Sequence, residues 1–228
     1  MQYDEVMARL RALANADNVA GMARYGIRPQ TETLGISVYT VREIAKDIKR
    51  DHALALQLWD SGVHEARLLA GIIADPGQMT PAEMDRWAAA FDSWDIVDQT
   101  TSNLFDKTPY AYQKALEWAG REEEFVRRAA YALIAALAVQ DKQAPDSAFE
   151  AFFPVIVSGA TDERNFVKKA VNWALRNIGK RSQALNASAI ALAREIQTIP
   201  AKSARWIASD ALRELTSDKA QARLARRK

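Results

Sequence analysis

Apolar residues along this chain recur with the spacing of an α-helix. In the segment 63–74, for example, Ala66, Leu69, Ala70 and Ile73 fall on one helical face. Glycine and proline separate such segments and are typical of helix starts and stops. These breaks lie at residues 75–77, 80–81, 108–109, 144–146 and 199–200. Sustained alternation of apolar and polar residues is absent, as is an Asn-Gly hairpin signal, so the pattern predicts an all-α protein.

Two of the helical segments repeat one another. Residues 124–133 read EFVRRAAYAL and residues 165–175 read NFVKKAVNWAL, 41 residues apart. Residues 64–70 and 204–212 are fainter copies of the same pattern. A period near 40 residues in helix pairs is typical of HEAT-like repeats, which stack into a curved α-solenoid with a concave face. We therefore expect one α-solenoid domain over residues 1–228, with the last few residues frayed.

The composition is that of an ordinary globular protein, with 49% hydrophobic and 26% charged residues. The lack of cysteine excludes disulfides and thiolate chemistry. His52 and His64 stand alone without the paired spacing of a zinc site, so we expect surface or helix-cap histidines and no metal. The longest apolar run, 129–139, is too short to span a bilayer, and the N-terminus does not resemble a signal peptide. We expect a cytoplasmic protein that needs no cofactor.

The basic residues are unevenly distributed. The net charge is only +2, but the segment from Arg164 to Lys228 holds 15 lysines and arginines against four acidic residues. This asymmetry favours a polyanionic partner. A basic surface that is merely solvated is the alternative that charge alone leaves open.

The stretch Phe91–Gln99, with sequence FDSWDIVDQ, places an indole and two carboxylates at the expected start of a helix. Trp94 and Asp98 are four residues apart, so they share a helical face one turn apart. This pairing suits a reaction that develops positive charge, because the ring attracts a cation and the carboxylate supplies a counter-charge or holds a water. The alternative is structural: Ser93 or Asp92 caps the helix, Asp95 favours its positive end, and the indole belongs to the core.

A pair of basic residues recurs in register at the start of two repeats, as Arg127-Arg128 and Lys168-Lys169. A helix N-terminus with basic side chains binds phosphate, so a stack of such helices could follow a nucleic-acid backbone. Because the pair recurs, we favour phosphate binding in a concave basic groove over basic residues that merely decorate solvent-facing turns.

Three motifs are found in order on this helical-repeat background. Trp-Asp-x-x-Asp occupies residues 94–98, Phe-Val-Arg-Arg-Ala-Ala residues 125–130, and Lys-Ala-Val-Asn-Trp-Ala-Leu-Arg residues 169–176. Together they resemble the DNA alkylation repair glycosylases with HEAT-like repeats, the AlkD family, from Gly21 to about Arg181. Each motif is weak alone, whereas the ordered set is specific. The resemblance implies a monofunctional glycosylase of base excision repair that hydrolyses the N-glycosidic bond of cationic N3- and N7-alkylated purines.

The same resemblance implies roles for individual residues. Asp98 matches the catalytic carboxylate, and Trp94 and Trp173 match the two indoles beside the deoxyribose. Arg128 matches the arginine that holds the nearby phosphate; a salt bridge with Asp98 or Asp95 is the alternative, and the two roles are compatible. Further positions match backbone contacts or an aromatic of the first repeat: Arg176, Lys180 and Tyr25. The implied partner is double-stranded DNA with alkylated bases, bound by a monomer without membrane or metal.

One departure lies one or two turns beyond Arg128, where some relatives have a lysine and this chain has Ala135-Ala136. One phosphate contact is therefore expected to be absent. Some branches of the family keep the fold and have lost the catalytic residues. In this chain the carboxylate and both indoles are present, which favours activity.

The chemistry fits this set of residues. An alkylated purine already carries positive charge and leaves as a neutral base, so no general acid is needed. The sugar becomes oxocarbenium-like, and a carboxylate with indole faces can stabilise that charge. Two rival functions stay open: a noncatalytic solenoid that binds branched or distorted DNA by shape, and a protein-interaction scaffold. The first predicts DNA binding without base release, and the second predicts no affinity for DNA.

The remaining aromatic and acidic residues are expected to be structural. Trp59, Trp87 and Trp118 lie in apolar helical patterns typical of a core, whereas Trp206 lies in a basic segment and is left open. Asp92 and Asp106 are expected at cap or turn positions, and the acidic run 122–124 at the start of a helix. The tail over residues 223–228 is expected to be solvated, with nonspecific contact to DNA as the alternative.

Overall fold

The structure, a computed structural model, describes residues 1–226 and is helical throughout, with no strand in that part of the chain. The all-α prediction is confirmed. The chain divides into two compact units, one ending at Tyr110 and the other beginning at Ala111. None of the described helices combines the length and the apolar character that crossing a bilayer requires. A single domain with a concave basic groove stays a prediction.

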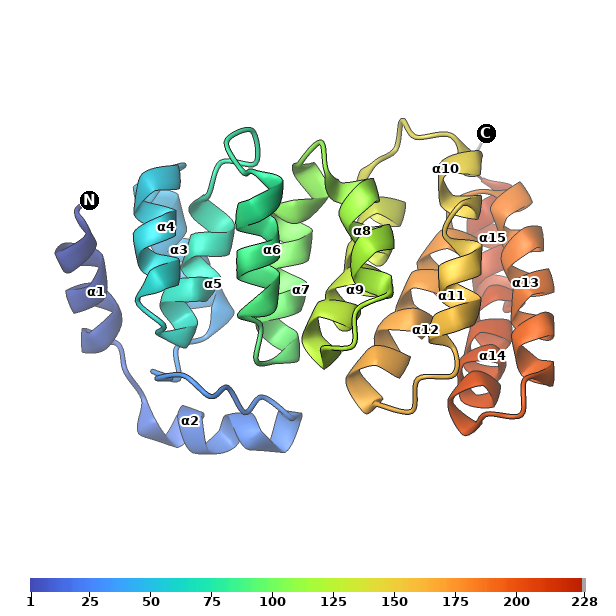
Figure 1. Cartoon of the computed structure of the whole chain (residues 1–228), viewed down its shortest axis with the longest axis horizontal. Helices are drawn as coiled ribbons and strands as arrows, with labels where there is room; N and C mark the ends of the chain where they lie inside the picture. The colour runs from blue at the N-terminus through green and yellow to red at the C-terminus, as the bar shows by residue number, and fades with distance from the viewer. Residues whose placement is uncertain (227–228) are drawn as a thin grey trace. The chain divides into compact units, whose positions relative to one another are not determined.

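The first unit is built around one helix, α5, which packs against α3, α4 and α7. Helix α2 runs crosswise to these helices (Figure 1). The elements of the unit are α1 (Tyr3–Ala12), α2 (Ala16–Met22), the 3-10 turn η1 (Ala23–Tyr25), α3 (Val38–Ile48), α4 (His52–Asp60), α5 (His64–Ile73), α6 (Pro81–Ala89), α7 (Trp94–Asn103) and the 3-10 turn η2 (Phe105–Lys107).

The helix boundaries follow the local sequence signals. Helix α6 begins with a capping box, in which the Thr80 hydroxyl accepts from the Glu83 amide and the Glu83 carboxylate accepts from the Thr80 amide. Pro81 occupies the first helical position, where no amide donor is needed. Asp51 caps α4 by accepting from the Leu54 amide at 3.0 Å. The predicted breaks therefore coincide with real helix ends.

Aromatic residues form the core of the first unit. The Trp59 and Trp87 rings stack with centroids 3.9 Å apart and planes 2° from parallel. Phe91 meets Trp59 edge-on, and Phe105 lies beside both Trp87 and Phe91. Both indoles are buried, as is that of Trp118 in the second unit, so the prediction of three core tryptophans is confirmed.

The second unit contains the two helices that the sequence identified as repeats, α9 and α12, packed against each other (Figure 1). Residues 223–225, expected to be frayed, belong to the last helix, whereas the expected frayed residues 227–228 lie outside the described part. The elements of the unit are α8 (Ala111–Ala119), α9 (Glu124–Gln140), α10 (Asp146–Glu150), α11 (Phe153–Gly159), α12 (Asn165–Gly179), α13 (Gln183–Thr198), α14 (Lys202–Leu215) and α15 (Asp218–Ala225).

Small residues let the helices of the second unit approach closely. Helix α9 is buried over most of its length and carries alanines at the positions that pack. Gly159 ends α11 against α9, where the Tyr131 hydroxyl donates to the Val155 carbonyl at 3.0 Å. A methyl group added at Gly159 would lie 2.2 Å from the Tyr131 hydroxyl oxygen and 3.0 Å from a Val171 methyl. This contact between α11, α9 and α12 therefore requires glycine.

We predict that Gly159→Ala lowers the free energy of unfolding by about 1–3 kcal/mol, because the added methyl overpacks a site that has no room to relax. Urea unfolding followed by circular dichroism measures the change as a lower midpoint. Gly120→Ala is the matched control, since its nearest neighbour would be an ordinary 3.7 Å away. Equal midpoints for the two variants would contradict the packing argument.

Candidate active site

Trp94 is the first residue of α7, as the sequence predicted, and it is held against the first repeat. Its indole N–H donates to the Tyr25 carbonyl at 3.1 Å, and the side chain stays partly exposed. Tyr25 ends the 3-10 turn η1, and its own side chain is 76% exposed. Two predicted site residues are thus neighbours, and the hydrogen bond limits rotation of the indole.

The two carboxylates of α7 have different surroundings. Asp95 is mostly buried, accepts from the His64 ring nitrogen Nε2 at 2.9 Å and also accepts from the Ser93 hydroxyl. Burial opposes the charged form of Asp95, but the hydrogen bond and the charge of His64, with the Ser93 hydroxyl, outweigh it and lower the pKa of Asp95. Asp95 is therefore a structural carboxylate.

Asp98 lies one turn after Trp94 on α7 and is partly exposed. Asp98 lies three positions after Asp95, so both carboxylates lie near the same side of the helix, about one turn apart along its axis. Asp95 has its oxygens engaged by His64 and Ser93, whereas Asp98 stands outside that buried pair. The placement of Asp98 beside Trp94 matches the arrangement expected from sequence, and its catalytic role stays a prediction.

The prediction that His64 lies on the surface is wrong. His64 opens α5 with 0% of its surface exposed, and its backbone amide donates to the Glu32 carbonyl at 2.8 Å. Burial alone would lower the pKa of His64, yet the hydrogen bond and charge of Asp95, with Glu65 and Asp92 nearby, raise it above the ordinary value. A buried, readily protonated histidine thus ties α5 to the start of α7.

A buried glutamate next to His64 organises the segment that leads from Tyr25 to α3. Glu65 is fully buried, and its carboxylate accepts from the amides of Leu34 at 2.8 Å, Gly35 at 2.6 Å and Ile36 at 3.2 Å. Gly35 has a positive φ of 74°, and a Cβ there would lie 2.3 Å from the Asn15 carbonyl oxygen, so the turn requires glycine.

A second ion pair tethers the same segment from the other side. Buried Arg67 pairs with Asp92 at 3.4 Å and lies over the Trp59 ring, 4.6 Å from its centroid. Asp92 also accepts from the Gln30 amide at 2.9 Å and from the Thr31 hydroxyl. Asp92 was expected to be a cap or turn residue; it lies in the loop before α7, next to the residue Ser93 at the N-cap, and it also anchors a distant segment. The structural roles of His64, Glu65 and Arg67 were not predicted. The signal that could have indicated them is the presence of three polar residues in the first turn of a helix whose other positions are apolar.

In the second unit, Arg128 is buried, with 6% of its surface exposed. Its guanidinium Nη1 donates to the Phe166 carbonyl at 2.7 Å, which joins the starts of the two repeat helices α9 and α12. The Phe125 and Phe166 rings, which are equivalent in the repeat, pack with centroids 5.7 Å apart. Arg128 therefore has a structural contact in addition to any contact with DNA.

The other basic positions of α12 differ in their surroundings. Lys169 is exposed, and the Lys168 amine lies 5.2 Å from the centroid of the Trp206 ring. Trp206, left open by the sequence, is 41% exposed and so joins this cation at the surface. Trp173, expected to be an indole of the active site, is partly exposed on the same helix.

Arg176 and Lys180, expected to contact the DNA backbone, form ion pairs within the second unit. Arg176 lies 2.6 Å from Glu214 and 3.4 Å from Asp210, and Lys180 lies 2.7 Å from Glu214. Burial alone would raise the pKa of Glu214, but the hydrogen bonds and charges of both cations lower it. A phosphate at these side chains has to share them with carboxylates.

Each unit thus gathers part of the predicted site. The first holds Tyr25, Trp94 and Asp98, and the second holds Arg128, Lys168, Lys169, Trp173, Arg176 and Lys180. Their convergence on one DNA-binding face stays a prediction. Over the described residues no group of three or more histidines, aspartates and glutamates has the arrangement of a metal site.

Known proteins with the same fold have been solved. One such structure is described as a new family of proteins related to the HEAT-like repeat DNA glycosylases with affinity for branched DNA structures. It superposes with a TM-score of 0.81 over 98% of this chain and 96% of its own, at 21% sequence identity. At that identity the likeness establishes the fold, which is the HEAT-like repeat fold expected from the sequence.

Sequence comparison extends the likeness to a bacterial relative. The uncharacterized protein Lin0241 of Listeria innocua is 20% identical over 128 residues, which cover 55% of this chain and 57% of that protein. The match therefore spans little more than half of the relative's length.

The sequence profile of one family covers nearly the whole chain. It is described as DNA alkylation repair enzyme, and it matches residues 6–215, which include every predicted site residue of both units. The chain belongs to the DNA alkylation repair enzyme family.

Proposed function

We propose that this protein is a monofunctional DNA glycosylase that hydrolyses the N-glycosidic bond of cationic N3- and N7-alkylated purines in duplex DNA. The observation that carries the proposal is the difference between the two carboxylates of α7. Asp95 is mostly buried and is hydrogen-bonded to His64, so this carboxylate supports the helix. Asp98 lies outside that pair, one turn from the oriented indole of Trp94.

In the proposed reaction the bond between C1′ of the deoxyribose and the alkylated purine breaks. Its electron pair goes to the positively charged ring, so the base leaves neutral without an added proton. The positive charge then develops on the sugar, where the Asp98 carboxylate and the Trp94 ring stabilise it. A water adds to C1′ and loses a proton to Asp98 or to solvent, which leaves an abasic site.

A second candidate function is noncatalytic binding of branched DNA. It is favoured by the solved structure of the same fold, whose family is described by its affinity for branched DNA. Recognition of DNA by shape needs a basic surface and no catalytic carboxylate. Such recognition does not require Arg128, Arg176 and Lys180 to contact a reacting nucleotide, so it is compatible with the burial of Arg128 and the ion pairs of the other two. Release of 7-methylguanine from a defined duplex, compared with affinity for a four-way junction, separates the two functions.

We predict that Asp98→Asn keeps DNA affinity nearly intact and slows excision by about 10²–10³-fold, because a preorganised charge partner of the transition state is lost. Single-turnover release of 7-methylguanine measures the rate, and fluorescence anisotropy measures the affinity. Ser102→Ala in the last turn of α7, which removes a hydroxyl that donates to the Asp98 backbone carbonyl and leaves the carboxylate in place, serves as the control. An undiminished rate in Asp98→Asn would remove this carboxylate from catalysis and favour the branched-DNA candidate.

Arg128→Ala is expected to have two effects. The free energy of unfolding falls by about 1–3 kcal/mol, because the Phe166 carbonyl loses its buried donor. DNA binding weakens for all sequences, and the plot of log affinity against log salt becomes less steep by about one, as for one lost phosphate contact. Lower stability with an unchanged salt slope would leave Arg128 with a structural role only.

The His64–Asp95 pair predicts a pH dependence of stability. Because folding raises the pKa of His64, the stability that this residue contributes is complete below the pKa of histidine in the unfolded chain, about 6.5. That stability is lost as the pH rises through the pKa of His64 in the folded protein. Because folding lowers the pKa of Asp95, the stability that this residue contributes is present above the pKa of aspartate in the unfolded chain, about 3.9. That stability is lost as the pH falls through the pKa of Asp95 in the folded protein.

Stability from this pair should therefore be greatest between about pH 4 and 6.5 and decline above that range. Urea unfolding at several pH values measures it. In His64→Gln the decline above neutral pH should be weaker than in the wild type. The matched control is His52→Gln, since that histidine has no ion pair in the described part of the chain. An identical pH profile in wild type and His64→Gln would contradict the assignment.

A further inference from the structure

The second unit contains a cavity of about 960 Å³ that is lined by five cationic side chains and one carboxylate. It lies where the end of α9, the end of α12 and the last helix α15 meet. The charged residues around it are Lys142, Lys180, Arg181, Arg223, Arg226 and Asp146. The site residues expected from the sequence include only Lys180 among them.

Two of the cations, Arg181 and Lys180, already have partners within the protein. The Arg181 guanidinium donates to the Ala138 carbonyl at 3.3 Å and to the Ala144 carbonyl at 2.7 Å, and it lies over the Phe149 ring. These carbonyls lie at the C-terminal end of α9 and in the loop beyond it, where the helix dipole is negative and would repel an anion. Arg181 offsets that repulsion.

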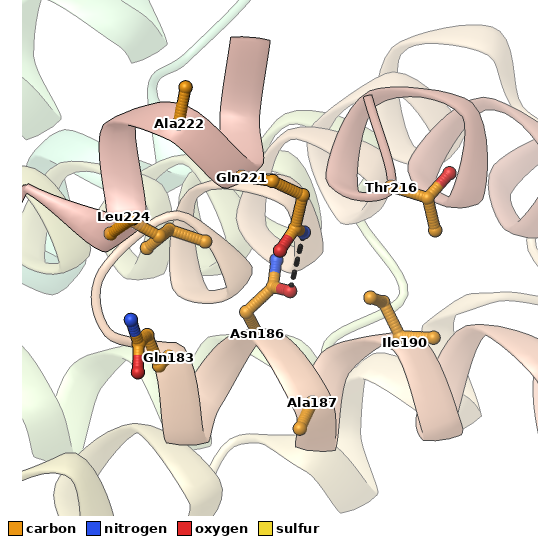
Figure 2. Close-up of a pocket in the computed structure, with 9 residues that line it drawn as sticks. Gln183, Asn186, Ala187, Ile190, Thr216, Gln221, Ala222 and Leu224 are labelled. Carbon is orange, nitrogen blue, oxygen red and sulfur yellow. Dashed lines mark hydrogen bonds between the residues drawn. The ribbon is translucent and has the colours of Figure 1, made fainter. Parts of the chain in front are cut away.

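Helix α15 is anchored on the side away from this cavity. Figure 2 shows Gln221 reaching Asn186 across a neighbouring pocket between α15 and α13. The Gln221 amide donates to the Asn186 side-chain oxygen at 3.0 Å and to the Leu215 carbonyl at 2.7 Å. Leu224 is buried, with 2% of its surface exposed. The anchored face fixes the helix, so Arg223 and Arg226, one turn apart, are presented to the cationic cavity.

The remaining cations have an uncompensated charge. Within residues 1–226, the side chains of Lys142, Arg223 and Arg226 form no ion pair or hydrogen bond, and all three are exposed. The one carboxylate of the cavity, Asp146, accepts from the Ser182 hydroxyl. Like charges gathered around one hollow repel each other, and an anion that enters relieves this repulsion. Arginine in particular matches the geometry of phosphate oxygens.

We propose that this cavity binds phosphodiester groups of a DNA strand, through Lys142, Arg223 and Arg226. The inference rests on the proposed function only in taking DNA as the ligand. Its volume exceeds what one small anion needs, and its cations come from three separate segments, so it suits consecutive phosphates of a strand rather than a single ion. The basic C-terminal segment thereby gains a defined place to hold the DNA backbone.

The double variant Arg223→Ala/Arg226→Ala tests the proposal in the full chain. Anisotropy of a labelled duplex between low and moderate salt should give a log–log salt slope less steep by about two, because each lost phosphate contact removes about 0.9. The single variant Lys142→Ala should reduce the slope by about one, and it keeps the test valid if the double variant does not fold. Arg194→Ala/Lys219→Ala, which removes two exposed cations away from the cavity, should leave the slope less affected.

The outcomes separate this proposal from the proposed function. An unchanged slope in both cavity variants overturns the phosphate site, as does an equal loss in the control variant. An equal loss of affinity for poly-glutamate overturns the assignment to phosphate. A wild type that releases no base, with the slope change present, overturns the glycosylase and supports the cavity.

Discussion

A buried ion pair between two helices supports the rest of the candidate site. His64 begins α5 with no exposed surface, and its partner Asp95 lies on the first turn of α7. A buried charge without a partner is unfavourable by several kcal/mol, so each of these residues requires the other. The pair therefore helps to determine where α7 begins, and with it the positions of Trp94 and Asp98 along that helix and the side of the helix on which they lie. The carboxylate of Glu65 acts likewise on the preceding segment, by binding three successive amides.

This constraint gives the two carboxylates of α7 different surroundings. A carboxylate that is already hydrogen-bonded to a buried histidine is less available as a counter-charge for a sugar cation. This applies to Asp95, whose hydrogen-bond partner is the buried ring of His64. The same reasoning applies to the basic residues of the second unit. Arg176 and Lys180 already share Glu214, so phosphates gain less from them than from exposed cations such as Lys169.

The sequence predicted the features that depend on neighbouring residues and missed those that depend on distant ones. Capping signals, prolines and apolar spacing located helix ends such as Thr80 and the core indoles of Trp59 and Trp87. The burial of His64 was not predictable, because its partner is 31 residues away on another helix. The pairing of Arg176 with Glu214 spans 38 residues, and that of Arg128 with the Phe166 carbonyl also spans 38. Such contacts join one repeat to the next, so a repeat period near 40 indicates where to look for them.

The geometry around Trp94 bears on the choice between a glycosylase and a shape-selective DNA binder. A protein that recognises a branched backbone by charge needs cations that adapt to the DNA, and it gains nothing from an indole held in one orientation. The Trp94 N–H is nevertheless bound to the Tyr25 carbonyl, on a segment that Glu65 and Asp92 tether. An aromatic ring stabilises a transition-state cation best when its face is already in position, because no reorganisation is then needed during the reaction. The proposed glycosylase would make use of this network, because it holds one ring in place on the helix that carries Asp98.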